Sequence, residues 1–167
     1  PKGRLRAAIN LSNFLLVTGK EANGDPQGVS PDMAKALANQ LGVELELISY
    51  NRPGELADAI SEDVWDIGNI ANEPERAKSI TFSSPYVLIE STYMVRNSLN
   101  INSIKDVDKE GIRIAVAERS AYDLWLTSNI KNAVLKRAKS INESFTIFED
   151  NKYEVLALSL IHISEPT

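Results

Sequence analysis

The chain has 167 residues, a net charge of −5 and a composition typical of globular proteins, with 43% hydrophobic and 25% charged residues. The acidic balance argues against a nucleic-acid surface, which needs a basic stripe, and no apolar run reaches the roughly 18 residues that span a bilayer. There is no cysteine, which excludes disulfides and thiol chemistry. The length allows one domain of good size or two small lobes.

The chain begins with a predicted strand over residues 3–10, where an apolar run follows basic residues. Residues 11–29 are predicted to form a loop, because their second half is rich in Gly, Asn, Asp and Pro. A helix follows: Ser30 is a good N-cap, Pro31 suits the first helical position, and Gly42 is a natural stop. The apolar residues expected on its buried face are Met33, Leu37 and Leu41, with Ala34 and Ala38 beside them.

The alternation of strands and helices continues along the chain. Residues 43–50 and 64–71 predict two further strands, and residues 55–61 predict a short helix between them. The order strand, helix, strand, helix, strand implies a parallel sheet with right-handed crossovers.

The second half repeats this pattern after a long apolar run over residues 86–97. A polar helix or turn is predicted at residues 103–111. Further strands are predicted at residues 112–118, 133–139 and 153–158, and further helices at residues 120–130 and 141–150. Two small α/β lobes, joined by an extended crossover near residues 91–95, fit this order.

Both ends of the sequence are unusual. The chain begins without an initiator methionine or a signal peptide, which indicates a removed leader or a fragment. Residues 156–163 have the pattern of a buried strand, but "SLIHISEPT" is similar to a translated sequencing-adapter tail. We therefore predict an incomplete first lobe at residues 1–92, an incomplete second lobe at 93–157, and a non-native tail at 158–167, in which His162, the only histidine, has no function.

Four segments are predicted to follow strand ends: residues 10–14, 51–53, 69–76 and 118–122. In open parallel sheets, ligands bind beyond the carboxyl ends of the strands. Within these segments, Arg76 can make a forked contact with a carboxylate. Ser120 stands at a helix start, where free backbone N–H groups favour an anion. A small carboxylate held by both would keep two lobes closed.

Three motifs in this order carry a family resemblance. They are "P-E-R … I-x-F-S-x-P-Y" at residues 74–86, "G-x-x-x-D" at residues 28–32, and "I-R-I-A-V-x-x-x-S" at residues 112–120. Together they resemble the periplasmic substrate-binding proteins of ABC transporters, in the amino-acid-type branch, family 3. The resemblance covers residues 4 to about 157 and implies a two-lobe periplasmic-binding-protein-like α/β fold.

The resemblance implies roles for particular residues. Arg76 takes the place of the arginine that grips the ligand's α-carboxylate, and Ser120 that of a helping hydroxyl. Three positions depart from the family: Ala71 lacks the usual hydroxyl, Asn10 replaces an acidic residue, and Asn13, beside Phe14, replaces an aromatic lid. The candidate ligand-binding residues are Arg76, Ser120, Asn69, Ala71, Asn10, Asn13 and Phe14.

Each candidate also has a structural interpretation. Arg76 can pair with Glu73 or Glu75 on a surface turn. Ser120 can act only as an N-cap, with Asp123 completing a capping-box-like pair. The asparagines can satisfy loop backbone groups, and Phe14 can be a packing residue. We expect Trp65 and Trp125 in the core, and the acidic residues Asp106, Asp108 and Glu110 on a solvated face rather than at a metal site.

The resemblance implies a monomeric, periplasmic binding protein that captures a small carboxylate-bearing ligand, such as an amino acid, by hinge closure and delivers it to an ABC transporter permease. It implies no cofactor, no metal and no enzymatic activity. Two alternatives share the fold. One is a ligand-sensing domain of a membrane receptor or a regulatory lobe of a lytic transglycosylase. The other is an enzyme resembling cyclohexadienyl dehydratase, which the absence of histidine from the four segments disfavours.

Overall fold

The computed structural model describes residues 3–159 and divides into two compact units, Pro1–Phe82 and Ser83–Thr167. The predicted limit between the lobes, at residues 92–93, falls inside strand β6 (Ser91–Val95), which belongs to the sheet of the second unit. Within residues 3–159, no helix is long and apolar enough to cross a membrane.

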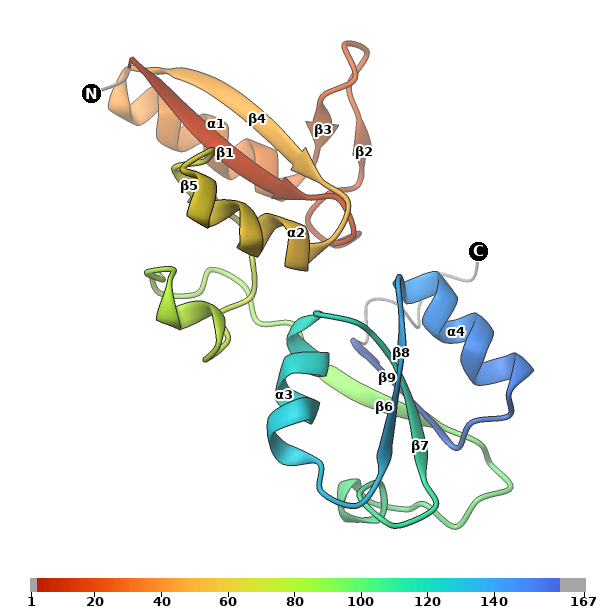
Figure 1. Ribbon diagram of the computed structural model, residues 1–167. Coiled ribbons are helices and arrows are strands. Elements are labelled where there is room, and N and C mark those ends of the chain that lie inside the picture. Colours follow the sequence, from red (N-terminus) through yellow and green to blue (C-terminus); the bar gives the residue numbers. More distant parts are fainter. Residues whose placement is uncertain (1–2, 160–167) are drawn as a thin grey trace. The chain divides into compact units, whose positions relative to one another are not determined.

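The first unit is built on the predicted parallel sheet, in the order β4–β1–β5. Its strands are β1 (Arg4–Asn10), β4 (Glu44–Tyr50) and the short β5 (Ile67–Gly68). Since α1 (Val29–Leu41) connects β1 outward to β4 and α2 (Pro53–Asp58) leads back across β1, right-handed crossovers place the two helices on opposite faces (Figure 1). A short 3-10 turn, η1 (Ala59–Glu62), follows α2.

The loop predicted at residues 11–29 contains a small hairpin of β2 (Gly19–Lys20) and β3 (Pro26–Gln27). It ends at Gly28, whose φ of 135° lies in the left-handed region. A Cβ at Gly28 would lie 2.6 Å from the carbonyl oxygen of Leu16, so only glycine fits this close approach. The helix therefore starts after Gly28, and the prediction of Ser30 as the N-cap is wrong by two positions.

The buried face of α1 also differs from the prediction. Pro31, Ala34 and Ala38 are buried, whereas Met33 is 46% exposed and Leu41 is 57% exposed. The helix packs on β1 and β4. Small side chains let a helix approach a sheet closely, so the alanine stripe faces inward and the bulkier stripe beside it faces out.

The core of the first unit lies between α2, η1 and the sheet. Ala8 and Leu56 are fully buried there, with Ala59 and Trp65 beside them. The indole Nε1 of Trp65 donates a hydrogen bond to the Leu56 carbonyl oxygen at 3.0 Å, which confirms Trp65 as a core residue with its polar atom satisfied. Of the strand predicted at residues 64–71, only β5 forms.

The second unit contains a four-stranded sheet in the order β6–β9–β7–β8. Strand β7 (Arg113–Ala117) runs parallel to β8 (Val134–Ala138) and β9 (Val155–Ser159), and β6 is antiparallel to β9. A 3-10 turn, η3 (Ile104–Asp106), precedes β7, and the helices are α3 (Ala121–Asn129) and α4 (Ile141–Asp150).

Alternate residues of β7 serve two cores. Ile114 and Val116 pack with Leu126 of α3, whereas Ala115 packs with Phe148 of α4. The period of two along a strand thus gives each face of the sheet its own helix (Figure 1). Trp125 was expected in the core, but it is 51% exposed, because the sheet-facing stripe of α3 passes through Asp123 and Leu126 instead.

Strand β9 continues through Leu158 and Ser159, which pair with Thr92 and Ser91 of β6 and are buried. These two residues belong to the segment predicted as a non-native tail. The rest of that segment, including His162, lies outside the described residues.

We expect Asp106 to make a pH-dependent contribution to the stability of the second unit. Lys109, Ser103 and the Asn102 amide bind its carboxylate, and together they lower its pKa from 3.8 to about 2. A carboxyl group with a lowered pKa stabilises the folded state above its unfolded pKa, and this stabilisation is lost as the pH falls toward the folded value. We expect urea midpoints of the wild type to fall more steeply between about pH 4 and pH 2 than those of Asp106→Asn. If the urea midpoints of the two proteins fall in parallel with pH, Asp106 contributes nothing to the pH dependence of stability.

Candidate functional site

The carboxyl ends of the first unit's strands bring three predicted segments together. Strand β1 lies between β4 and β5, so the loops that follow the three strands are neighbours at one edge of the sheet. The Leu11 amide donates to the Tyr50 carbonyl oxygen at 2.9 Å and joins the first two loops. The Asn69 amide donates to the Ala8 carbonyl oxygen at 3.3 Å and joins the third.

Arg76 is the most buried cation at this edge, at 5% exposure, and begins the 3-10 turn η2 (Arg76–Lys78). Its Nη1 donates to the Ala71 carbonyl oxygen at 3.1 Å, so Ala71 orients the guanidinium through its backbone. The carboxylate of Glu75 pairs with Lys78 at 2.6 Å, and that of Glu73 accepts the backbone amides of Glu75 and Arg76. Arg76 is therefore buried rather than exposed on a surface turn.

The turn after β1 contains three further candidates. The Oδ1 of Asn10 accepts from the amide and hydroxyl of Ser12, which is the loop-stabilising role that asparagine often has. The Oδ1 of Asn13 is buried and has no hydrogen-bond partner among the described residues. The Phe14 side chain is 51% exposed and lies outside the core. Buried acceptors are normally satisfied, so Asn13 is where this turn can still accept a donor.

Asn69 connects the exit of β5 to the start of α1. Its Nδ2 donates to the Ser30 carbonyl oxygen at 2.9 Å. The carbonyl groups of a helix's first turn already accept intrahelical bonds, so this contact is an additional one that holds α1 against the strand end. Asn69 thus has a structural role in the first unit.

Ser120 lies in the second unit and is the N-cap of α3, as predicted. Its Oγ accepts from the Asp123 amide at 3.2 Å and donates to the Ala117 carbonyl oxygen at 2.7 Å. A hydroxyl has one proton, so Ser120 must give up its bond to Ala117 before it can donate to a ligand. Burial raises the pKa of the neighbouring Tyr122 to about 12, so this phenol stays neutral at physiological pH.

Arg119, next to Ser120, has a φ of 60° in the left-handed region. This conformation costs a residue with a Cβ about 1–2 kcal/mol, and glycine does not have this cost. Glycine in turn loses about 0.5–1 kcal/mol on folding, because its unfolded chain has more conformational entropy. We expect Arg119→Gly to be more stable than Arg119→Ala by about 0.5–1 kcal/mol in urea unfolding. The alanine variant is the matched control, because both variants lack the arginine side chain. Equal stabilities would mean that the turn relaxes when the side chain is removed.

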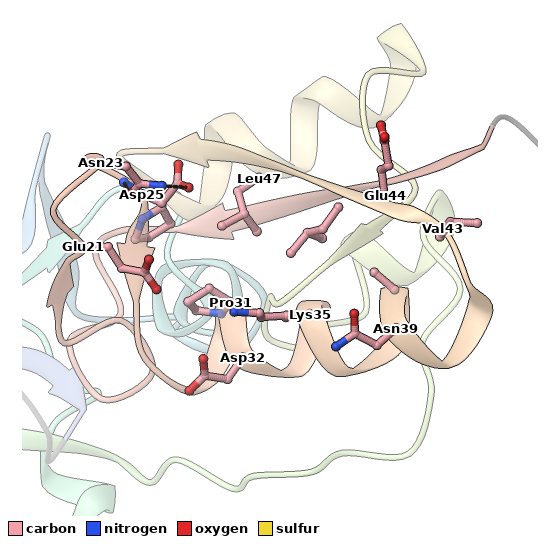
Figure 2. Close-up of a pocket in the computed structure, with 13 residues that line it drawn as sticks. Glu21, Asn23, Asp25, Pro31, Asp32, Lys35, Asn39, Val43, Glu44 and Leu47 are labelled. Atoms are coloured by element: carbon pink, nitrogen blue, oxygen red, sulfur yellow. Dashed lines mark hydrogen bonds between the residues drawn. The ribbon is translucent and has the colours of Figure 1, made fainter.

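A groove of about 410 Å³ lies elsewhere on the first unit, between α1, β4 and the β2–β3 hairpin (Figure 2). Its rim carries four carboxylates, from Glu21, Asp25, Asp32 and Glu44, and one ammonium, from Lys35. None of the predicted ligand-binding residues lines this groove. Among residues 3–159, no group of three histidine or carboxylate side chains is arranged to hold a metal ion.

Comparison with known proteins agrees with the fold and with the resemblance. Residues 12–157 match the family model "Bacterial extracellular solute-binding proteins, family 3". The L-cystine-binding protein TcyJ of Escherichia coli is 30% identical over 111 residues, which are 65% of this chain and 41% of that protein. The matched region is thus less than half of the curated relative's length.

Solved structures show the same fold. A putative ABC-transporter binding component from Wolinella succinogenes, complexed with lysine, matches with a TM-score of 0.75 and 22% identity over 96% of this chain and 70% of that one. The ancestral amino acid-binding protein AncCDT-1, a precursor of cyclohexadienyl dehydratase, matches with a TM-score of 0.74 and 23% identity over 95% and 70% of the two chains. Because the family model matches residues 12–157, which are most of the chain, this chain belongs to the bacterial extracellular solute-binding proteins of family 3.

Proposed function

We propose that the chain binds a small carboxylate-bearing ligand, an amino acid or a related compound, outside the cytoplasm and delivers it to an ABC transporter permease. Arg76 is the observation that carries the proposal. Arg76 is 5% exposed, and the Ala71 carbonyl oxygen holds its guanidinium near the carboxyl ends of parallel strands. A guanidinium in such a place is suited to binding a ligand carboxylate. The named ligands of similar proteins, L-cystine and lysine, are both amino acids.

In this proposal, Arg76 is the carboxylate-binding residue of the first unit, and Ser120 with the first amides of α3 is the carboxylate-binding element of the second unit. Asn69, Ala71 and Asn10 shape the loops of the first unit through the contacts described above. Asn13 and Phe14 face the rest of the ligand, the first as an acceptor and the second as an apolar surface. The protein acts as a monomer and closes on its ligand by hinge motion.

A calorimetric screen with matched amine controls tests the proposal. L-lysine, L-arginine, L-glutamine and L-cystine are titrated, and each binder is compared with its decarboxylated counterpart, such as cadaverine for lysine and agmatine for arginine. We expect at least one amino acid to bind, and its amine to bind at least about a hundredfold more weakly, because the charged hydrogen bonds to the carboxylate are lost. Equal binding of acid and amine, or no binding by any carboxylate, contradicts the proposal.

An enzyme on the same fold is the second candidate, because AncCDT-1 is a precursor of cyclohexadienyl dehydratase. Such a reaction needs an acid or base beside the substrate. In the first unit, Glu73 accepts two backbone amides and Glu75 pairs with Lys78, so both carboxylates already have structural partners. We therefore propose binding without turnover. Conversion of prephenate or arogenate by the purified chain would overturn this choice.

A further inference from the structure

Asp123 of α3 is a buried carboxylate that organises the turn before its own helix. It is 4% exposed, and its Oδ2 accepts the Arg119 amide at 2.7 Å. Its own amide donates to Ser120 Oγ. The left-handed Arg119 and the N-cap hydroxyl of Ser120 are thus both bound to one residue. This arrangement sets the direction in which Ser120 and the first amides of α3 point.

Arg137, from the edge strand β8, binds the other oxygen of this carboxylate. Its Nε donates to Asp123 Oδ1 at 2.9 Å, and its Nη2 donates to Thr127 Oγ1 at 2.7 Å. Thr127 in turn donates to the Asp123 carbonyl oxygen, one turn back along α3. The guanidinium is therefore held against α3 at two points, although 42% of the Arg137 side chain is exposed.

The charge of Asp123 would oppose the function proposed for this helix end. The Asp123 carboxylate is buried, and the backbone amide of the same residue donates to the Ser120 hydroxyl. Its negative charge therefore repels a ligand carboxylate that approaches this hydroxyl. The guanidinium of Arg137 compensates this charge while it leaves the second oxygen free to hold the Arg119 amide. The turn thus keeps a strong acceptor without a net negative charge.

We propose that Asp123 and Arg137 are positioning residues of the carboxylate site in the second unit: Asp123 fixes the Arg119–Ser120 turn, and Arg137 neutralises Asp123 so that an anion can approach. This inference rests on the proposed function, since it deepens the role of Ser120. The Asp123–Arg137 ion pair thus has a role in ligand binding in addition to its role at the start of α3.

Acetate, the carboxylate fragment common to all amino acids, provides a probe that does not depend on the identity of the ligand. The amides of Ala121 and Tyr122 are followed by two-dimensional NMR during titration with sodium acetate, against a titration with sodium chloride. We expect a saturable, acetate-specific shift in the wild type. Arg137→Met should weaken acetate binding by about threefold or more, because the charge of Asp123 is then uncompensated. Asp123→Asn combined with Arg137→Met should restore the affinity to within about twofold, because the repelling charge is gone.

The structural control is Asp108→Asn. The Asp108 carboxylate accepts the three amides of Lys131, Asn132 and Ala133, so it too binds backbone amides in the second unit, but just beyond the C-terminal end of α3 rather than before its N-terminal end. This variant should lower stability and leave acetate binding unchanged. A second readout is amide hydrogen exchange of Arg119, which should become faster in Asp123→Ala, where its acceptor is removed, and stay slow in Asp108→Asn.

Each alternative outcome counts against the inference. Acetate binding that is unchanged in Arg137→Met, or equally weak in the double variant, overturns the charge argument. Unchanged exchange of the Arg119 amide in Asp123→Ala overturns the positioning argument. If the wild type shows no acetate-specific shift on α3, the inference fails as a whole. The amino-acid screen judges the proposed function separately, because it measures the binding of whole amino acids and does not depend on an acetate shift at α3.

Discussion

We expect Arg76→Lys to weaken amino-acid binding by about tenfold or more, since the loss of one charged hydrogen bond costs about 1.5–3 kcal/mol. A guanidinium offers a planar fork that matches both oxygens of a carboxylate, whereas an ammonium is a point charge on a flexible stem. Arg76 is already oriented by the Ala71 carbonyl oxygen, and a lysine cannot use that acceptor and two carboxylate oxygens in the same geometry. Calorimetry with the amino acid that binds in the screen measures the change.

The matched control for Arg76→Lys is Arg4→Lys. Arg4 lies on β1 in the same unit and pairs with Glu46 at 3.1 Å, but its side chain is 56% exposed. An exposed ion pair contributes about 0–1 kcal/mol, so this exchange should change neither stability nor affinity measurably. Equal affinity of wild type and Arg76→Lys would remove Arg76 from the site.

The second large effect is expected at Asp66, the partner of Arg6 on β1, the middle strand of the first unit's sheet. Asp66 Oδ2 accepts the Arg6 amide at 2.9 Å and Nε at 3.1 Å, and Oδ1 accepts Nη2 at 2.7 Å. The Arg6 side chain is 11% exposed, and its Nη1 also donates to the Asp63 carbonyl oxygen. Asp66→Ala leaves this guanidinium without its forked acceptor. We expect a loss of about 2–3 kcal/mol in the free energy of unfolding, measured by urea titration.

A double variant distinguishes the effect of losing the Arg6–Asp66 ion pair from the effect of leaving the Arg6 charge without that partner. Removing one partner of an ion pair is most costly when the remaining charge is buried, and Arg6, whose side chain is 11% exposed, would keep only the Asp63 carboxylate at 3.2 Å. Replacing both partners by apolar residues of similar size removes that charge as well. Arg6→Met combined with Asp66→Leu should therefore be more stable than Asp66→Ala alone. If the double variant is as unstable as the single one, Asp66 acts mainly through its bond to the Arg6 amide.

The strand and helix pattern was readable from the sequence because its signals are local. Apolar runs marked β1, β4 and β7, and Gly42, with a φ of 66°, ends α1 as predicted. Ser120 was identified as an N-cap from the residues around it, and the structure shows the bond from the Asp123 amide. Such features depend on neighbouring residues, whose spacing the sequence displays directly.

The errors of prediction lie where distant residues decide. The start of α1 depends on the approach of Gly28 to the Leu16 carbonyl oxygen, and its buried face depends on how closely a helix can approach β1 and β4. Trp125 was expected in the core because it is large and apolar, but the stripe through Asp123 and Leu126 faces the sheet. Propensity and composition cannot choose between two adjacent stripes of one helix, because packing selects the face.

The sequence by itself determined the α/β class, the order of the elements and the motifs that place the chain among family 3 solute-binding proteins. It also singled out Arg76 and Ser120 as candidates. Only the tertiary structure decided that Arg76 is buried against the Ala71 carbonyl oxygen, that the Ser120 proton is already donated to Ala117, and that Arg137 pairs with Asp123. The physical reason is the same in each case. Burial and hydrogen bonding are settled by atoms that other elements bring in, and their positions exist only once the sheets have formed.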